Sequence, residues 1–319
     1  MRKFIIDTDT GSDDAVALMM AVLSTEAEVL GLTTVSGNVR LEQATRNALM
    51  TLEVCGGSTL PVCPGLDQPM YGAPVTAENV HGDDGMGDLD LIHPSGESAG
   101  VHGVDFLLEQ VRKYPGELEL VMLGPATNVA AAILRDREAM AGLKHIWSMG
   151  TAGFGRGNTT PVAEFNVYAD PGSYRVLVES GIPLTIIGAD VSLGTAAWEA
   201  AWNQGDMERI AASGTIGKFA VDCNRALLEY NLRNGRHMVD LPDAVAMAVA
   251  LWPEVILEAK ECGCYCHTGQ DPCYGQVVFY DPEEELAIPT RMPKARARVI
   301  TKLHAERYKA RLEALLSGK

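Results

Sequence analysis

Residues 3–14 read KFIIDTDTGSDD, and this stretch decides how the chain begins to fold. Its apolar half predicts a strand over 3–7 that ends in an aspartate. The apolar residues 15–23 predict a helix, and Asp13 and Asp14 fall at its start, where the helix macrodipole favours negative charge. A strand that passes through a polar turn directly into a helix is the opening unit of an α/β fold.

The same alternation of strand and helix continues along the chain. Further strands are predicted at 29–35, 61–63, 118–123, 145–149 and 183–187, and helices at 41–54, 104–113, from 127, at 171–180, around 215–231 and at 243–250. Such alternation favours an α/β fold with a mostly parallel central sheet and helices on both faces. No internal repeat, low-complexity segment or linker interrupts the pattern, so we expect a single domain, 1–319.

Composition and charge narrow the class of partner. The chain has 319 residues, 47% of them hydrophobic and 21% charged, as in ordinary globular proteins. Its formal net charge of −16 argues against nucleic acid or an anionic membrane as partner, because both need clustered Lys and Arg. The apolar run 4–6 is too short for a signal peptide, and the longest apolar stretch, 15–23, is about half a membrane span. We therefore expect a cytoplasmic protein with neither nucleic acid nor membrane as partner.

Polar residues follow four of the predicted strands at the point where each strand ends. They are the acidic cluster 7–14, Asn38, the pair Leu123-Gly124 and the Gly-rich segment 149–166. In open α/β sheets, ligands bind outside the carboxyl ends of the strands. We expect these four segments to converge on one edge of the sheet and to form the functional site.

Four aspartates, Asp7, Asp9, Asp13 and Asp14, lie within the first of these segments. Carboxylates this crowded repel one another unless a cation joins them. Oxygen ligands suit a hard divalent ion such as Ca²⁺ or Mg²⁺. The alternative is that Asp13 and Asp14 only cap the helix while backbone amides hold Asp7, and it leaves part of the cluster unexplained. We therefore predict a divalent-metal site that supports hydrolytic chemistry.

The longer string DTDTGSDDA at 7–15 resembles the nucleoside hydrolase family, the inosine–uridine-preferring nucleoside N-ribohydrolases. The resemblance continues in the order of that family through Gly37-Asn38, Thr45-Arg46-Asn47-Ala48, HGDDGMGD at 81–88, LGPATN at 123–128, Gly157-Asn158, PVAEFN at 161–166 and Asp170-Pro171. It implies a Rossmann-like nucleoside hydrolase fold. It also implies Ca²⁺-dependent hydrolysis of the N-glycosidic bond of ribonucleosides to free base and ribose.

The resemblance further implies a role for each matched residue. Asp9 and Asn38 would be catalytic, with Asp9 as general base on a metal-bound water. The Ca²⁺ ligands would be Asp9, Asp14, the Leu123 carbonyl and Asp243. The substrate-binding residues would be Asp13, Asn38, His81, Met149, Asn158, Glu164, Asn166, Tyr230 and His237. A pocket of carboxylates and amides around the sugar would stabilise the positive charge that develops on ribose and would reject deoxyribose.

One position departs from the family pattern. Many members carry a His directly before the C-terminal metal-binding Asp, where it protonates the leaving base. Pro242 occupies that place here, and proline cannot transfer a proton. Tyr230 and His237 precede Pro242, on a segment that borders the base pocket in the family, and both are candidates for activating the base. His237 is the nearby side chain that titrates close to neutrality.

Two other functions stay open from the sequence. Asp7-x-Asp9 after an apolar strand matches the signature of haloacid-dehalogenase phosphatases, in which the first Asp is the nucleophile, although the later Lys and Asp pair of that class are not evident. The departure at Pro242 also allows a non-catalytic protein that binds a nucleoside or ribose. Base release from nucleosides distinguishes the hydrolase from both alternatives.

Three further properties are less determined. The spacing of Cys262, Cys264, Cys266 and Cys273 around His267 fits a zinc site poorly, and alternate residues of a strand share a face, so buried thiols are favoured. The residues that would contact the base lie in variable loops, so the sequence does not decide between purine and pyrimidine substrates. The overall resemblance slightly favours pyrimidine. Members of the family are usually dimers or tetramers, so a homodimer or homotetramer is expected.

Overall fold

The computed structural model describes residues 1–90, 93–193, 197–283 and 295–318. Within these residues a nine-stranded sheet has the order β3-β2-β1-β4-β5-β6-β9-β7-β8. The strands are β1 Arg2–Thr8, β2 Ala27–Thr34, β3 Val62–Pro64, β4 Leu118–Met122, β5 His145–Met149, β6 Leu184–Ile187, β7 Ile256–Cys266, β8 Val277–Tyr280 and β9 Arg296–Leu303. Pairs from β3 to β9 are parallel, and β7 is antiparallel to both β9 and β8. The predicted single α/β domain with a mostly parallel sheet is confirmed.

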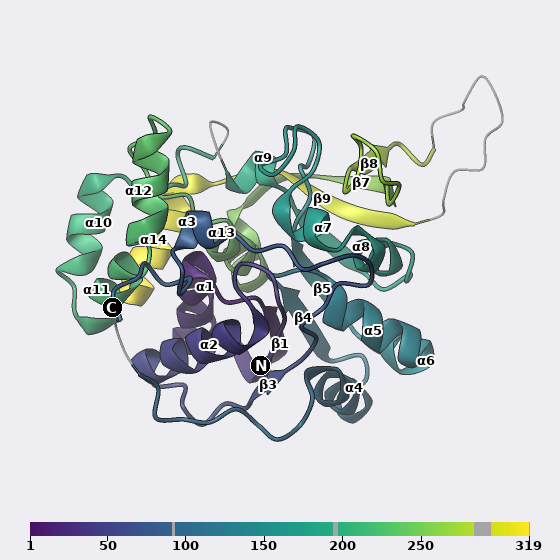
Figure 1. The fold of residues 1–319 in the computed structure, drawn as a ribbon, viewed down its shortest axis with the longest axis horizontal. Helices are drawn as coiled ribbons and strands as arrows, with labels where there is room; N and C mark the ends of the chain where they lie inside the picture. Colours follow the sequence, from purple (N-terminus) through teal and green to yellow (C-terminus); the bar gives the residue numbers. More distant parts are fainter. Residues whose placement is uncertain (91–92, 194–196, 284–294, 319) are drawn as a thin grey trace.

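Helices cover both faces of this sheet (Figure 1). Two apolar clusters, one on each face, hold them there: α1, α2, α13 and α14 contribute to the first, and α4, α5 and α8 to the second. The helices are α1 Ser12–Leu23, α2 Leu41–Cys55, α3 Glu78–His81, α4 Gly103–Lys113, α5 Thr127–Arg135, α6 Arg137–Met140, α7 Phe165–Ala169, α8 Pro171–Val178, α9 Ala189–Ser192, α10 Gln204–Ala211, α11 Thr215–Asp222, α12 Arg225–Arg233, α13 Pro242–Leu251 and α14 Ala305–Leu316, with a 3₁₀ turn η2 at Pro253–Val255. In the described part of the chain, no helix is both long enough and apolar enough to cross a membrane.

Strand β1 is apolar on both sides because both faces of the sheet are covered. Phe4 and Ile6 belong to the apolar cluster beneath α1 and α13, while Ile5 belongs to the cluster beneath α4 and α5. The three side chains are completely buried. Strand β1 therefore runs through the centre of the molecule and delivers the acidic turn that follows it to the interior end of the sheet.

The strand order reverses at β1, and this reversal positions the site. From β1 the chain moves outward to β2 and β3, then returns to place β4 on the other side of β1. The loops after β1 and β4 consequently leave the sheet in different directions. Such a switch point is where open α/β sheets form a ligand-binding crevice.

The C-terminal third differs most from the sequence-based expectation. The helix expected around 215–231 is two helices, α11 and α12, because the side chain of Asn224 sits between them and donates hydrogen bonds to Ala220 O and Ser12 O. Helices α10 and α14, strand β9 and the part of β7 that precedes the cysteines were not predicted. Strand β7 is largely exposed over its first half and buried over its second, so its sequence shows no regular hydrophobic period.

The cysteine cluster lies in strand β7 and the loop after it. Cys262, Cys264 and Cys266 are buried, and Cys273 is exposed. Desolvation raises the pKa of the Cys264 thiol to about 12, so this thiol stays protonated at neutral pH. The expectation of buried thiols is confirmed for the three cysteines of the strand.

Candidate active site

A cavity of about 940 Å³ lies at the carboxyl ends of the parallel strands. Asp13 after β1, Asn38 after β2, Met149 at the end of β5 and Ala189 after β6 all line it. The start of α13 adds Asp243 to the wall. A volume of this size is at the upper end of those that hold small-molecule ligands. Segments far apart in the sequence therefore converge on one cavity at the predicted edge of the sheet.

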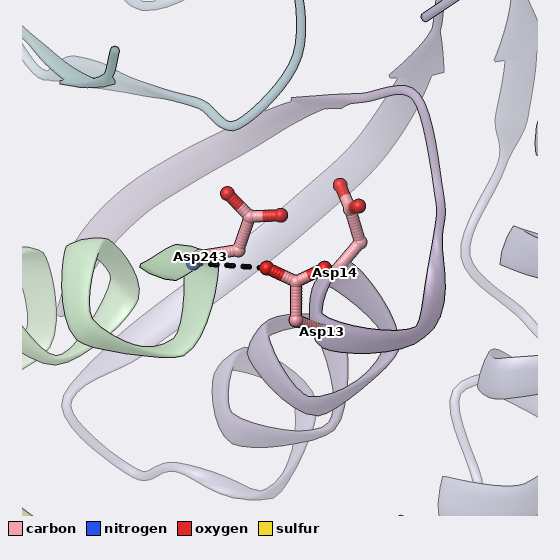
Figure 2. Close-up of side chains that lie close together, drawn as sticks. All are labelled: Asp13, Asp14 and Asp243. Carbon is pink, nitrogen blue, oxygen red and sulfur yellow. Dashed lines mark hydrogen bonds between the residues drawn. The ribbon is translucent and has the colours of Figure 1, made fainter. Parts of the chain in front are cut away.

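Three carboxylates gather at the start of α1 and the start of α13 (Figure 2). Asp13, Asp14 and Asp243 are buried, and each offers an oxygen within 4.8 Å of the others. The backbone N–H of Asp243 donates to Oδ2 of Asp13 at 3.4 Å. Desolvation raises the pKa of Asp13 and of Asp14 to about 6 and raises that of Asp243 well above its usual range. The cluster is therefore costly to keep ionised without a positive charge.

Asp9 lies next to this group and is itself completely buried. The backbone N–H of Asn38 donates to its Oδ2 at 2.6 Å, and its Oδ1 has no hydrogen-bond partner among the described residues. Desolvation and the neighbouring Asp14 raise the pKa of Asp9 well above its usual range. A Cβ on Gly37 would stand 2.0 Å from Asp9 Oδ2, and one on Gly124 would stand 2.8 Å from Oδ1. Glycine at these two positions makes room for the carboxylate.

Asp14 is held more completely than Asp9. Thr8 Oγ1 donates to its Oδ1 at 2.6 Å, and the backbone N–H of Gly11 donates to its Oδ2 at 2.8 Å. The Asn38 amide also donates to Oδ2, at 2.9 Å. Asn38 lines the cavity and so connects both Asp9 and Asp14 to it. The turn after β1 thereby orients its carboxylates toward one point.

A divalent cation fits this donor set. Four carboxylates are buried together, and desolvation raises the pKa of each. Neighbouring aspartates raise the pKa values of Asp9, Asp14 and Asp243 further, and one oxygen of Asp9 lacks a partner within the described ranges. Hard oxygen donors select an ion such as Ca²⁺ or Mg²⁺. The predicted ligands Asp14 and Asp243 belong to the closest group, and Asp13, which was expected on the ribose, belongs to it as well.

The predicted backbone ligand Leu123 and two predicted substrate residues meet beside β4. Nδ2 of Asn166 donates to the Leu123 carbonyl oxygen at 2.6 Å and lies 3.3 Å from Sδ of Met149. Asn166 and Met149 line the cavity. A carbonyl oxygen has two lone pairs, so the bond from Asn166 leaves Leu123 able to accept a second partner.

Glu164 lines the cavity from the N-cap position of α7. Its carboxylate accepts hydrogen bonds from the backbone N–H groups of Asn166 and Thr151, at 3.0 and 3.1 Å. Thr151 has a positive φ of 77°, a backbone conformation that is strained for a β-branched residue. Desolvation raises the pKa of Glu164 to about 7 despite these bonds. Asn158 also lines the cavity, where it is exposed and accepts from the Phe165 backbone at 2.9 Å.

Three further predicted substrate-binding residues, His81, Tyr230 and His237, occupy different places. His81 lines the cavity, and its Nδ1 lies 2.9 Å from Ser12 Oγ and 3.8 Å from Asp13 Oδ1. Desolvation lowers the pKa of His81 to about 4, which favours a neutral ring. Tyr230 on α12 lines the cavity too. His237 is exposed and is not among the described residues that line the cavity.

Asp7 takes no part in the cavity wall among the described residues. It is completely buried, and Thr33 Oγ1 and Asn128 Nδ2 donate to its Oδ1 at 2.5 and 2.8 Å. Asn128 in turn donates to Thr34 O, so Asp7 fastens α5 to strand β2. This position gives no support to Asp7 as a phosphatase nucleophile and agrees with a supporting role.

Sequence reasoning missed several polar residues that line the cavity. Arg156, Asp190, Asn231, Arg236 and Asp240 do so in addition to the predicted set. No motif marks them, because they lie on loops or helix ends whose paths depend on tertiary contacts. The clearest signal available was the pair Arg236 and Asp240, an opposite-charge pair four residues apart and directly before Pro242.

Comparisons with known proteins find matches among nucleoside hydrolases and nucleosidases. The family model described as inosine-uridine preferring nucleoside hydrolase matches residues 4–310. Uridine nucleosidase 1 of Arabidopsis thaliana is 44% identical over 192 residues, which is 60% of this chain and 57% of that relative. The chain therefore matches less than two thirds of the length of that relative.

Two further proteins match over a larger share. The pyrimidine-specific ribonucleoside hydrolase RihB of Escherichia coli is 33% identical over 282 residues, 87% of each chain. A solved plant nucleoside hydrolase superposes with a TM-score of 0.93 at 29% identity, covering 100% of this chain and 99% of the other. The order and arrangement of the elements thus belong to a fold with solved members.

Proposed function

The chain belongs to the inosine-uridine preferring nucleoside hydrolase family, and we propose that it hydrolyses the N-glycosidic bond of ribonucleosides to a free base and ribose. The observation that carries this proposal is the buried group Asp13, Asp14 and Asp243, two of which, Asp13 and Asp243, line the cavity, with Asp9 beside the group. Carboxylates concentrated at this point stabilise the positive charge that forms on the sugar as the bond breaks.

We propose Ca²⁺ as the resident ion. Asp9, Asp14, Asp243 and the Leu123 carbonyl would hold it, with Asp13 directed to the ribose. When bound, such an ion lowers the pKa of a coordinated water and neutralises the surrounding carboxylates. The support is the all-oxygen donor set, which excludes metals that prefer sulfur.

Side chains of the protein supply the other catalytic, sugar-binding and structural functions. Asp9 accepts the proton of the attacking water, since its Oδ1 has no other partner in the described part of the chain. Asn38, Glu164 and Asn166 line the cavity and offer the ribose hydroxyls both donors and acceptors. Met149 supplies an apolar wall at the end of β5. Asp7 contributes by holding α5 in place.

We further propose that uridine, or another pyrimidine ribonucleoside, is the preferred substrate. Two of the relatives reported above carry names that specify uridine or pyrimidine substrates, and they supply this support. We also propose that the protein acts as a homodimer or homotetramer in the cytoplasm, as the resemblance to the family implies.

Incubation with uridine, inosine and a phosphate monoester tests the proposed function. Release of free base and ribose from a ribonucleoside is the expected result. Release of phosphate from the ester without release of any base would replace the proposal by a phosphatase. Tight binding of ribonucleosides in calorimetry with no turnover would show a binding protein instead.

A further inference from the structure

Pro242 stands where many members of the family carry a proton-donating histidine. Two charged side chains lie on the same wall of the cavity. Arg236 and Asp240 line the cavity together with Pro242 and Asp243. Nη1 of Arg236 lies 3.3 Å from Oδ2 of Asp240. The side chain of Asp240 is 5% exposed and that of Arg236 is 32% exposed. The carboxylate is therefore buried, while the arginine side chain remains partly exposed at the cavity wall.

The turn that carries this pair has a fixed shape. Asn231, which is 1% exposed, donates from its side chain to the backbone oxygen of Met238 at 2.9 Å. The backbone N–H of Arg236 donates to Asn231 O, also at 2.9 Å. Val239 and Trp202 exchange two backbone hydrogen bonds of 2.9 Å. Arg236 thus belongs to a segment that is held by these hydrogen bonds and leads into α13.

We propose that Arg236, oriented by Asp240, stabilises the negative charge that forms on the leaving base and thereby selects bases that carry carbonyl oxygens. This inference rests on the proposed hydrolysis of ribonucleosides. It assigns the guanidinium a direct contact with the base and gives Asp240 a positioning role. It also explains how the reaction proceeds with a proline at the position of the missing acid.

The reaction balances without proton donation from Arg236. The bond between C1′ and the ring nitrogen breaks, and its electron pair leaves with the base. The oxygen of the attacking water forms the new bond to C1′, and the proton of that water passes to Asp9. The base departs as an anion whose charge is shared between its ring nitrogen and its carbonyl oxygens. It then takes up one proton from solvent, to which Asp9 returns the proton that it accepted.

The guanidinium is suited to this anion. It presents five N–H donors in a planar fork, of which the bond to Asp240 engages one. A uracil ring offers it two carbonyl acceptors beside the ring nitrogens. Adenine has no carbonyl oxygen to share the leaving charge, and its amino group is a donor that faces the N–H donors of the fork unfavourably. The geometry therefore favours uridine over adenosine.

Substitution of Arg236 by glutamine tests the contact with two substrates that differ in their leaving group. Uridine needs its leaving base stabilised, whereas p-nitrophenyl riboside releases an anion that is already stable. R236Q should lower kcat/KM about 100-fold for uridine and less than about 3-fold for p-nitrophenyl riboside. R236K, which keeps the charge and loses the planar fork, should fall between wild type and R236Q on uridine.

A matched control comes from α12. Arg225 pairs with Glu229 at 3.0 Å with the same four-residue spacing, and both side chains are more than half exposed. Neither residue is among the described residues that line the cavity. R225Q should leave both rate constants within about 2-fold of wild type. Equal losses on both substrates in R236Q would overturn the assignment of Arg236 to the leaving base.

The test of Asp240 must measure a property that would not change if this residue had only a structural role. D240N should reproduce the selective loss on uridine, and the double variant R236Q/D240N should be no slower than R236Q alone. Thermal unfolding of each variant shows whether the protein remains folded. Additive losses, or losses that ignore the leaving group, would remove Asp240 as the positioning residue. If the wild-type protein releases a leaving group from neither substrate, the proposed function itself fails, and this inference fails with it.

Discussion

The backbone N–H of Asn38 donates to Oδ2 of Asp9 at 2.6 Å, so a residue after β2 fixes a carboxylate that follows β1. The same residue donates from its side chain to Asp14 at 2.9 Å. One asparagine thus orients two of the four buried aspartates and lines the cavity as well. The site depends on the pairing of β1 with β2 as much as on the aspartates themselves.

Replacing Asp9 by asparagine should abolish turnover while leaving the protein folded. The amide cannot accept the proton of the attacking water, and we expect kcat to fall by at least about 1,000-fold. The melting temperature of the ion-free protein should stay the same or rise, because one of several repelling carboxylates is removed. D105N is the matched control, since Asp105 is an exposed carboxylate on α4 that pairs with Arg135. Retained activity in D9N would remove Asp9 as the general base.

Gly37→Ala tests the position of Asp9 without changing any charged group. The added Cβ would stand 2.0 Å from Asp9 Oδ2, so the carboxylate has to move. We expect kcat for uridine to fall at least about 10-fold, because misplaced catalytic groups lose much of their effect. Gly100→Ala is the control, since a Cβ there meets nothing within 4 Å. Equal rates for the two variants would show that the observed position of Asp9 does not limit the reaction.

The core of the fold and its acidic turn were predictable because their signals are local. The apolar run at 3–7, the helix that follows and the polar residues at the strand ends each reflect the immediate sequence. The first half of β7 was missed because it is largely exposed and shows no regular hydrophobic period. Helices α11 and α12 were merged because the break between them depends on contacts made by Asn224. Pairing of β7 with β9 joins segments distant in the sequence, which no local pattern encodes.

In the candidate site, too, the residues that lie in local motifs were predictable, and those placed by tertiary packing were not. Asp9, Asp14 and Asn38 lie in strong motifs, and the structure brings Asn38 into contact with both aspartates. Which carboxylates group most closely was not readable, because that depends on how α13 packs against α1. Arg236 carries no motif, and only the folded turn places it on the cavity wall.

Ribose and deoxyribose should be sharply distinguished. Asn38, Glu164 and Asn166 are buried polar residues on the cavity wall, and the ribose 2′-hydroxyl would satisfy part of this set. A substrate without that hydroxyl leaves buried polar groups unpaired, which costs about 10⁴-fold in kcat/KM in sites of this kind. Parallel assays of uridine and 2′-deoxyuridine measure the ratio. Rates that agree within about 10-fold would contradict the assignment of these residues to the sugar hydroxyls.

Glu119 is expected to stabilise the fold in a pH-dependent way. Burial alone would raise its pKa, but hydrogen bonds from Arg2, Trp147 and Lys144 outweigh burial and lower the pKa from 4.5 to about 2. Because the folded-state pKa lies below the unfolded one, the contribution is complete above 4.5 and is lost as the pH falls toward 2. E119Q should lower the free energy of unfolding by about 1–3 kcal/mol near neutral pH.

Urea unfolding of E119Q and wild type across the acid range measures this contribution. The difference between the two proteins should shrink as the pH falls below 4.5. E117Q is the matched control, because Glu117 lies two residues before Glu119, pairs with Lys3 and has a side chain that is 62% exposed. A difference between E119Q and wild type that stays constant down to about pH 2 would rule out the ionised Glu119 as its source.

The most direct test of the acidic site is the dependence of uridine hydrolysis on a divalent ion. The chelated protein should lose activity, and Ca²⁺ added back should restore it and raise the melting temperature, in line with about 2.7 kcal/mol of stabilisation at 100 times the dissociation constant. D14N should show neither the recovery nor the shift in melting temperature, while D105N should show both. Full activity in the presence of chelator, with no ion-dependent change in melting temperature, would contradict the assignment of the aspartate cluster as a metal-dependent hydrolytic site.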